Sequence, residues 1–571
     1  MTDRLDAAKH AWRCALGADA VETDPASPAA ARRLRNCAGF AAEFAAILRP
    51  ETEADVVKAV QIAAMHGAPL YPVSCGRNWG YGSAVPPRDG AALLDLSRLD
   101  RISNFDPETG VVRLGPGVTT GRLSEFLASR NAPFLTPTTG AGPKGSVVGN
   151  ALDRGYGLTP YTDHFAAVTR IRAVTPAGGV YETPLSLLGG AQADDCFKWG
   201  VGPYLDGLFA QGNFGIVTEM SIALAPKPEH LDLVFIEFAE KDLEAMMRAL
   251  QAFMRAAGGA APGFNLLNRL RLLSMLAPYP HDLAPLGRAL DEAQERALAR
   301  KWGAPEWMAL VPIMSAREVA APLRRLLRDR LRGLRAKIRI LSGGRARRLA
   351  WLADRLPEQA AALKRRARAA ADTVDILSGI PRETALKLAY WKSKSAPPQS
   401  DLDPDRDGCG LLWYAPLVPM QSGALESMNA LVRKIMPQFG FEPLITFTAL
   451  NDRCFDATTP ILFDPSTERD AAHACYDALF AAGRKLGFLP YRLSARKFSL
   501  LERENGEYWR LAAAVKQAVD PAGVIAPGRY VPAHAAEEAS RFDDCGEGAP
   551  EANATDADER ASNQRAQRNT A

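Results

Sequence analysis

The fold of this chain is decided by one glycine-rich stretch, Gly145-Ser-Val-Val-Gly-Asn-Ala-Leu-Asp-Arg-Gly-Tyr-Gly-Leu-Thr-Pro-Tyr-Thr-Asp-His164. It places four glycines within 13 residues. Glycine carries no side chain, so a backbone rich in it can approach another molecule more closely than other residues allow. The stretch therefore indicates a loop that lies against a bound ligand.

Two further glycine-rich segments lie on either side of it, Pro72-Val-Ser-Cys-Gly-Arg-Asn-Trp-Gly-Tyr-Gly-Ser-Ala84 and Phe197-Lys-Trp-Gly-Val-Gly-Pro-Tyr-Leu-Asp-Gly-Leu-Phe-Ala-Gln-Gly-Asn-Phe-Gly-Ile-Val217. The first of them ends a strand-like run, and its three glycines leave backbone N–H groups free to surround an anion such as a pyrophosphate. Such a turn is equally typical of a plain hairpin. It indicates a ligand only because a second region agrees with it.

The surrounding sequence alternates helical and strand-like patterns, which predicts an α+β fold. We expect helices over residues 51–66 and 242–257, and strands over residues 68–73, 91–96, 110–114, 168–174, 216–224, 231–238 and 411–417. Two prolines, Pro226 and Pro228, precede a change of character in the sequence. They predict a domain boundary near Pro228.

Taken together, the glycine-rich segments resemble the FAD-binding domain of the vanillyl-alcohol oxidase and p-cresol methylhydroxylase family. Its members show a G-R-N-x-G-Y-G loop, a G-N-x-x-[ED]-R-G-x-G-x-T-P-Y-x-D-H segment and a G-P-Y-x-D-G-L-F-x-Q-x-N-x-G-I-V-T segment. Near the end of the chain, Tyr491-Arg492 and Asp520-Pro-Ala-Gly-Val-Ile-Ala-Pro-Gly528 match as well. The resemblance covers roughly residues 45–530, with a looser middle. No G-x-G-x-x-G follows the first strand, so the site is not of the Rossmann type.

The resemblance implies an α+β flavoprotein of two domains, a PCMH-type FAD-binding domain and an α+β cap domain that supplies most of the substrate pocket. For this chain it gives an N-terminal segment (1–44), the FAD-binding domain (45–228), the cap (229–495) and a segment that returns to the FAD-binding domain (496–535). Within the cap, residues 320–371 are rich in arginine and predict a basic helical insertion. Residues 536–571 contain almost no large apolar side chains and predict a disordered tail.

The resemblance also implies which residues hold FAD, with the pyrophosphate against residues 74–82 and 145–150. We expect cofactor contacts from Ser74, Gly76, Arg77, Asn78, Trp79, Gly80, Gly82, Ser83, Gly145, Ser146, Gly149, Asn150, Gly155, Gly215, Ile216, Val217 and Arg529. Relatives often attach the flavin covalently through a histidine or a tyrosine. In some of them a histidine falls at Tyr81, and in others the histidine lies in the stretch that here reads Thr446 to Phe463. That stretch contains neither histidine nor tyrosine. We therefore predict non-covalent FAD, with attachment at Cys454 or a neighbouring residue as the alternative.

Three residues match the family positions that bind a phenol oxygen as phenolate, namely Tyr81, Tyr491 and Arg492. The pattern makes chemical sense because a guanidinium stays cationic at any working pH, and phenolic O–H donors beside it stabilise a bound oxyanion. Tyr161 also falls at a position that lines the family's site. An ordinary strand pair and a packed turn are the structural alternatives for Tyr491-Arg492 and Tyr161.

One departure from the family pattern concerns the carboxylate near flavin N5, whose position falls near Ala141 in this chain. Lys144 could take up the charge or be a solvent-exposed loop residue. The leading expectation is an FAD-dependent oxidase or dehydrogenase that takes a hydride from a phenolic or related aromatic substrate. The alternatives are a non-phenolic alcohol, a hydroxy acid or a biosynthetic intermediate as substrate, and a flavoprotein subunit whose role is mainly interaction.

Composition excludes other classes of function. The formal net charge of +4 on 571 residues is too small to indicate a nucleic-acid partner. The eight cysteines and seven histidines show no metal-ligand spacing, and the acidic run at 403–407 lacks the glutamate of a calcium loop, so it reads as a polar surface turn. With no apolar run that marks a signal peptide, we expect a cytoplasmic protein.

The sequence also limits the partners that we expect. A small-molecule substrate is required, and either O₂ or an electron-carrier protein accepts the electrons. A homo-oligomer is left open. The basic residues 320–371 favour a solvated helix face over contact with a membrane or an acidic partner.

Overall fold

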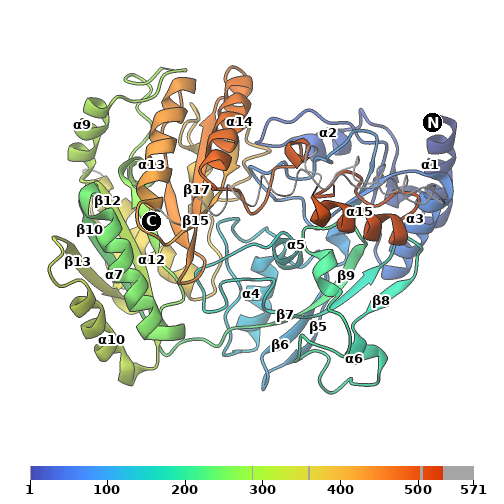
Figure 1. Cartoon of the computed structure of the whole chain (residues 1–571), viewed down its shortest axis with the longest axis horizontal. Helices are drawn as coiled ribbons and strands as arrows, with labels where there is room; N and C mark the ends of the chain where they lie inside the picture. The colour runs from blue at the N-terminus through green and yellow to red at the C-terminus, as the bar shows by residue number, and fades with distance from the viewer. Residues whose placement is uncertain (1, 286, 358–359, 502–505, 532–571) are drawn as a thin grey trace, which may run out of the picture.

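The structure, a computed structural model, describes residues 2–285, 287–357, 360–501 and 506–531. The predicted disordered tail at 536–571 lies outside the described residues. Figure 1 shows two adjoining halves, with the N-terminal half on the right and the middle of the chain on the left. No helix among the described residues is long and apolar enough to cross a membrane.

The first sheet of the N-terminal half has the order β1-β2-β4-β3, with β2, β4 and β3 parallel to one another. Helices α1 and α3 pack together beside it, and the buried Trp12 Nε1 donates to the Ala59 carbonyl at 3.0 Å. The elements are α1 (Thr2–Leu16), β1 (Val21–Glu22), α2 (Pro28–Leu34), β2 (Ile47–Leu48), α3 (Glu53–His66), β3 (Leu70–Val73) and β4 (Ala92–Asp95).

Helix α3 shows why the sequence begins and ends a helix where it does. Thr52 and Asp55 form a reciprocal capping box at its start, and Gly67 ends it in the left-handed region at φ 62°. The expected helix over residues 51–66 is confirmed with a start two residues later. Strand β3, which leads into the first glycine-rich loop, is held against this helix layer.

The second sheet is antiparallel and has the order β5-β6-β9-β7-β8. Its two longest strands, β7 and β9, pair with each other, and their buried side chains include Ile171, Met220 and Ile222. Strand β7 spans the residues that the sequence predicted. The elements are β5 (Ile102–Asp106), β6 (Val111–Leu114), α4 (Thr120–Ser129), α5 (Val147–Leu152), β7 (Val168–Val174), β8 (Val180–Glu182), α6 (Pro184–Leu187) and β9 (Ile216–Ala223).

The middle of the chain forms a sheet of eight strands that begins at His230, two residues beyond the predicted boundary. Its path is β13-β10-β12-β11-β16-β17-β14, and β15 also pairs with β17. The strands are β10 (His230–Phe238), β11 (Asn265–Asn268), β12 (Trp307–Ser315), β13 (Lys337–Ser342), β14 (Gly410–Tyr414), β15 (Leu417–Pro419), β16 (Thr446–Ala449) and β17 (Cys454–Phe463). The expected strand over residues 411–417 is thus divided between β14 and β15.

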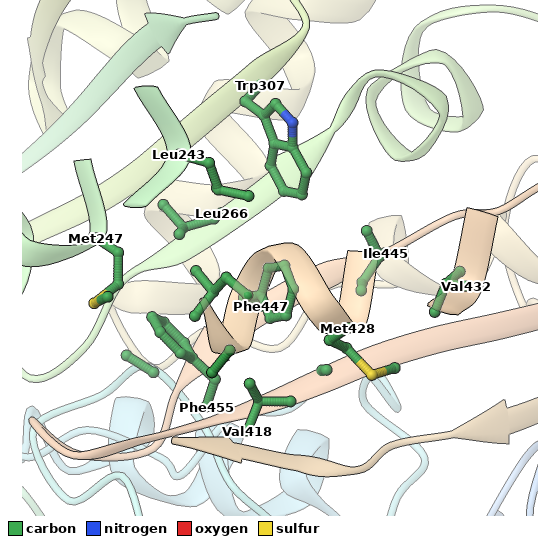
Figure 2. Close-up of a cluster of buried hydrophobic side chains, with 14 of the residues drawn as sticks. Leu243, Met247, Leu266, Trp307, Val418, Met428, Val432, Ile445, Phe447 and Phe455 are labelled. Atoms are coloured by element: carbon green, nitrogen blue, oxygen red, sulfur yellow. The ribbon is translucent and has the colours of Figure 1, made fainter. Parts of the chain in front are cut away.

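We call this eight-stranded sheet the cap sheet. Successive side chains along its strands point to opposite faces, and each face is covered by a different layer of helices. Val234 and Ile236 belong to the largest core, which α7 (Leu243–Ala257), α13 (Ala424–Ile435) and α14 (Arg469–Lys485) cover. Figure 2 shows part of this core, where Met247, Met428 and Phe455 come from different elements. Leu233 faces the opposite layer, which holds α8 (Arg269–Leu276), α11 (Gly343–Ala353) and α12 (Ala361–Leu377).

The basic segment 320–371 is not wholly helical, and the prediction of a helical insertion is wrong for residues 337–342. These residues form β13, which pairs along its length with β10 at the edge of the cap sheet. Alternating exposed and half-buried side chains give it the period of a strand. The helices that precede it in the chain are α9 (Glu292–Trp302) and α10 (Arg317–Arg330), and those that follow are α11 and α12.

The C-terminal segment returns to the N-terminal half. After α15 (Glu507–Val519), the backbones of Leu70 and Ile525 pair beside β3. The Lys516 ammonium donates to the Asp520 carboxylate and to the carbonyls of Asn213 and Ile525. The returning segment is therefore anchored by a buried ion pair as well as by the core.

Candidate functional site

A cavity of about 550 Å³ extends from the N-terminal half into the cap. This is within the usual size of small-molecule and cofactor sites. Its walls come from the glycine-rich loops, from the cap sheet with α8, α12 and residues 385–389, and from residues 491–530. Segments far apart in the sequence therefore meet around one cavity.

Most residues that the sequence assigned to the cofactor line this cavity. They are Ser74, Gly76, Arg77, Asn78, Trp79, Ser83, Gly145, Ser146, Gly149, Asn150, Gly155, Gly215, Ile216, Val217 and Arg529. Gly80 and Gly82 are not among the lining residues. A Cβ at Gly80 would collide with the Trp413 ring, and one at Gly82 would lie 2.9 Å from Ala495. These two glycines allow the loop to pack against the cap.

The first glycine-rich loop carries a run of free backbone donors. No described residue accepts a hydrogen bond from the amides of residues 75–79, whereas the amides of Gly80, Tyr81 and Ser83 are bonded. Consecutive free N–H groups in a turn form a concave site for an anion. The loop thus offers the chemistry that a pyrophosphate requires.

The acidic residues 403–407 hold this loop in place. Asp403 is buried and accepts from Arg77 at 2.5 Å, and Asp405 accepts from the backbone amide of Cys37 at 2.7 Å. Burial raises the pKa of Asp405 to about 6. The run does form the predicted polar turn, with Arg406 and Gly408 exposed, but it is not wholly solvated, because Asp403 is buried against Arg77 and Asp405 bonds to Cys37. Within the described residues, no cluster of acidic, histidine or cysteine side chains could hold a metal ion.

A second network joins the glycine loops to the C-terminal segment. Asp153 accepts from Asn78 Nδ2 at 3.0 Å and from Arg529 at 2.5 Å. Sequence reasoning passed over Asp153, although it lies within the quoted stretch and separates two glycines. Its position between Asn78 and Arg529 fixes three walls of the cavity relative to one another.

Tyr81, Tyr491 and Arg492 meet at one place in the cavity wall. The guanidinium carbon of Arg492 lies 4.1 Å from the centre of the Tyr81 ring and 5.5 Å from that of Tyr491. Burial raises the pKa of both tyrosines, and Arg492 opposes that rise. The Nε of Arg492 has no hydrogen-bond partner among the described residues. The cluster therefore contains a cation, two phenolic O–H groups and an unused donor.

Tyr161 does not join this cluster. Its side chain is 44% exposed and borders a separate, much smaller hollow beside Leu135 and Pro137. Tyr156, five residues earlier, lines the main cavity instead. Its ring meets that of Tyr491 edge-on, with centres 5.6 Å apart. The turn at Thr159-Pro160 thus carries Tyr161 away from the site while Tyr156 remains in it.

Asp456 is a functional candidate that sequence reasoning missed. It lies on β17 in register with Thr448 of β16, which is itself in register with Asn265 of β11, and all three line the cavity. Burial raises the pKa of Asp456 to about 7, although Arg492 and Thr458 oppose the rise. Its Oδ1 has no partner among the described residues. An enclosed carboxyl group with such a pKa can take up or release a proton near neutral pH.

The segment expected to carry a carboxylate near the flavin brings none. Ala141 lines the cavity at that place. Lys144 forms an ion pair with Asp401 and is not among the lining residues. The question left open for Lys144 is therefore answered, because its charge is compensated outside the cavity.

Comparison with known proteins agrees with this architecture. Residues 44–184 match the model of an FAD binding domain. The 1'-carboxy-chondrochloren decarboxylase of Chondromyces crocatus is 36% identical over 537 residues, which cover 93% of this chain and 98% of the relative. The chain belongs to the vanillyl-alcohol oxidase and p-cresol methylhydroxylase family. It is an FAD-dependent oxidoreductase.

Other family members are similar over most of their length. The 4-cresol dehydrogenase [hydroxylating] flavoprotein subunit of Pseudomonas putida is 28% identical, over 82% of this chain and 84% of the relative. Two solved structures share the fold: p-cresol methylhydroxylase with substrate bound (TM-score 0.82, 24% identity) and 4-ethylphenol oxidase from Gulosibacter chungangensis (TM-score 0.83, 22% identity). They cover 93% and 94% of this chain and 98% of each structure.

The residues present fit FAD. The free amides of residues 75–79 suit a pyrophosphate. The indole Nε1 of Trp79 and the Oδ1 of Asn213, both in residues that line the cavity, have no hydrogen-bond partner in the part of the chain that the structure describes. Buried polar atoms without partners are costly, so these positions favour a ligand that bonds to them. The cavity then continues past the tyrosine and arginine cluster into the cap, where a substrate has room.

Proposed function

We propose that the protein removes a hydride from the benzylic carbon of a 4-substituted phenol, which Tyr81, Tyr491 and Arg492 hold as its phenolate. The observation that carries this proposal is the enclosed guanidinium of Arg492 between two phenolic rings, with its Nε unused. An oxyanion at this place would receive charge-assisted hydrogen bonds from groups that are already held in position. A phenolate gives up a para benzylic hydride far more readily than a neutral phenol.

Asp456 has the properties needed to accept the phenol's proton. Its carboxylate acts on the same cluster, because it raises the pKa of both Tyr81 and Tyr491. We propose that the phenolic proton passes to Oδ1 of Asp456 while Arg492 stabilises the oxygen that is left. Bound FAD supplies the two-electron acceptor for the hydride.

Oxidative decarboxylation is a second candidate for the complete reaction, favoured by the decarboxylase name of the 36% identical relative. After loss of the benzylic hydride, a carboxylate on the adjacent carbon can leave as CO₂. The electron pair of the broken C–C bond then forms a C=C bond and restores the phenolate. This route needs no added water, which is compatible with Ala141 in place of a carboxylate.

The substrate class is tested by anaerobic bleaching of the flavin absorbance. We expect 4-ethylphenol and 4-hydroxybenzyl alcohol to bleach it, and 3-ethylphenol and 4-ethylanisole to leave it yellow, because the last two cannot donate through a para phenolate. Bleaching by 2-hydroxy acids but not by any 4-alkylphenol would overturn the proposal. Release of CO₂ from 3-(4-hydroxyphenyl)propanoate separates the second candidate from simple dehydrogenation.

We propose that FAD is bound without a covalent link. The cavity-lining residues of the described chain include no histidine, and Cys454 is not among them. Denaturation in trichloroacetic acid is expected to leave the yellow colour in the supernatant. Colour that stays with the precipitated chain would show a covalent bond.

Replacing Gly149 with valine is expected to weaken FAD binding about tenfold or more. A Cβ at Gly149 would lie 2.9 Å from Ser74 Oγ, so the larger side chain forces the two glycine loops apart at a cost typical of overpacking. The ratio of flavin to protein absorbance measures the loss. Gly344→Val is the matched control, since nothing lies within 4 Å of its Cβ. Equal FAD content in the two variants would contradict the assignment.

A further inference from the structure

The cap end of the cavity contains an arginine without an acidic partner. Arg271 lies in the first turn of α8 and lines the cavity. Its side chain is half-buried in the cavity wall and donates only to Ser274 Oγ, at 3.0 Å, among the described residues. No described carboxylate acts on it, and burial lowers its pKa to about 10.

The lack of an acidic partner distinguishes Arg271 from Arg269, which lies two residues earlier on the same helix. Arg269 pairs with Glu295 at 3.4 Å and with Glu306 at 3.3 Å, and it does not line the cavity. An enclosed charge without a counter-ion is costly for the folded protein, because it loses hydration and gains no Coulomb attraction. A cost of this kind is offset when a ligand supplies the opposite charge.

We propose that Arg271 binds a carboxylate at the far end of the phenolic substrate, so that the substrates are 4-hydroxyphenyl compounds with an acidic side chain. This inference rests on the proposed function. It adds a second anion site to the cavity, separate from the cluster that receives the phenolate.

The sheet register associates the two cationic sites with different strands of the cap sheet. Leu267 of β11 is in register with Thr446 of β16, which is in register with Thr458 of β17. With two strand spacings between them, Leu267 and Thr458 lie about 10 Å apart. Arg492 opposes the rise that burial causes in the pKa of Asp456, which lies on β17. Arg271 lies on α8, which follows directly from β11. The separation suits a phenol ring followed by a short carbon chain.

Apolar side chains in the cavity wall favour a substrate with an apolar middle. They include Leu267, Leu310, Ile376 and Leu386. An uncharged alkylphenol can occupy this wall but leaves the guanidinium of Arg271 unpaired. A carboxylate that reaches Arg271 can accept two parallel N–H bonds from its planar fork.

The test compares two non-oxidisable ligands of equal shape, 4-hydroxycinnamate and 4-hydroxycinnamamide, by calorimetry on the FAD-loaded protein at pH 7.5. We expect the wild-type protein to bind the acid about 10- to 100-fold more tightly than the amide. In Arg271→Met the acid and amide should bind equally, with amide affinity nearly unchanged. Arg271→Lys should keep part of the preference, and Arg269→Met, the matched control, should keep all of it.

Each outcome decides the inference. Equal binding of acid and amide by the wild-type protein, or a preference that persists in Arg271→Met, would overturn it. A purely structural Arg271 would lower the melting temperature when replaced and leave the acid-to-amide ratio intact. If Arg271→Met does not fold, an acid-to-amide affinity ratio in Arg271→Lys equal to that of the wild-type protein would also overturn the inference.

A failure of the proposed function can be distinguished from a failure of this inference. If 4-ethylphenol bleaches the flavin but acid and amide bind alike, only the carboxylate site is wrong. If no 4-alkylphenol or 4-hydroxyphenyl acid bleaches it, the phenol assignment itself is wrong, and the carboxylate site falls with it.

Discussion

Replacing Arg492 with methionine is expected to lower kcat for a phenolic donor by about 10²- to 10³-fold. The guanidinium is the only cation placed against the Tyr81 ring in the described structure, and methionine keeps much of its volume without its charge. Removal of a preorganised donor from a developing oxyanion costs this amount in other enzymes. Single-turnover bleaching of the flavin measures the effect without interference from reoxidation.

Three companion variants make the result specific. Tyr81→Phe and Tyr491→Phe each remove one O–H donor and should lower the rate by smaller factors. Arg496→Met is the matched control, because Arg496 pairs with Asp89 outside the cavity. A full rate in Arg492→Met with normal FAD content would show that the phenolate is not bound there. An equal loss in Arg496→Met would point to a general structural effect.

Much of the fold could be predicted because the decisive signals are local. Glycines at fixed spacing identify loops that contact a ligand, and the motif from Gly145 to His164 is long enough to identify a family. Strand β7 and helix α3 follow from hydrophobic period and capping residues. Such features depend on neighbours in the sequence, which a single chain shows directly.

The rest of the site depends on contacts between distant segments, which the sequence does not display. Asp456 becomes a candidate only because the fold places it and Arg492, which lies far along the chain, in the wall of the same cavity. One signal was present, since Asp456 interrupts a strand that is otherwise apolar or small. The edge strand β13 was missed because the arginine-rich segment around it, residues 320–371, has a helical composition, and because the pairing of β13 with β10 is a tertiary contact.

The role of Tyr161 shows the limit of a motif in another way. Its position in the matched segment predicted a place in the site, yet the turn after Tyr156 directs it elsewhere. A motif determines the backbone course more firmly than the direction of each side chain. Tyr156, which the motif also contains, occupies the place beside Tyr491.

Replacing Asp456 with asparagine is expected to lower the rate at pH 7 by about 10²- to 10⁴-fold, the usual contribution of a positioned general base. In the wild-type protein the pKa of Asp456 is about 7, so kcat/KM should rise with pH through neutrality as the carboxylate forms. The variant should lose this rise. Its rate should recover only near pH 10, where the phenol ionises without help.

The same substitution makes a separate prediction for stability, with the opposite direction in pH. Because the folded protein raises the pKa of Asp456 from 3.8 to about 7, the stability linked to its protonation is complete below pH 4 and is lost as pH rises to 7. The melting temperature of Asp456→Asn should therefore match that of the wild-type protein near pH 4 and exceed it by a few degrees above pH 7.

Asp452→Asn is the control for both the rate and the melting measurements, because the Asp452 carboxylate pairs with Arg255 at the surface. A neutral-pH rise that survives in Asp456→Asn would assign the proton to another group, and a constant melting difference across pH would show that Asp456 does not titrate in this range.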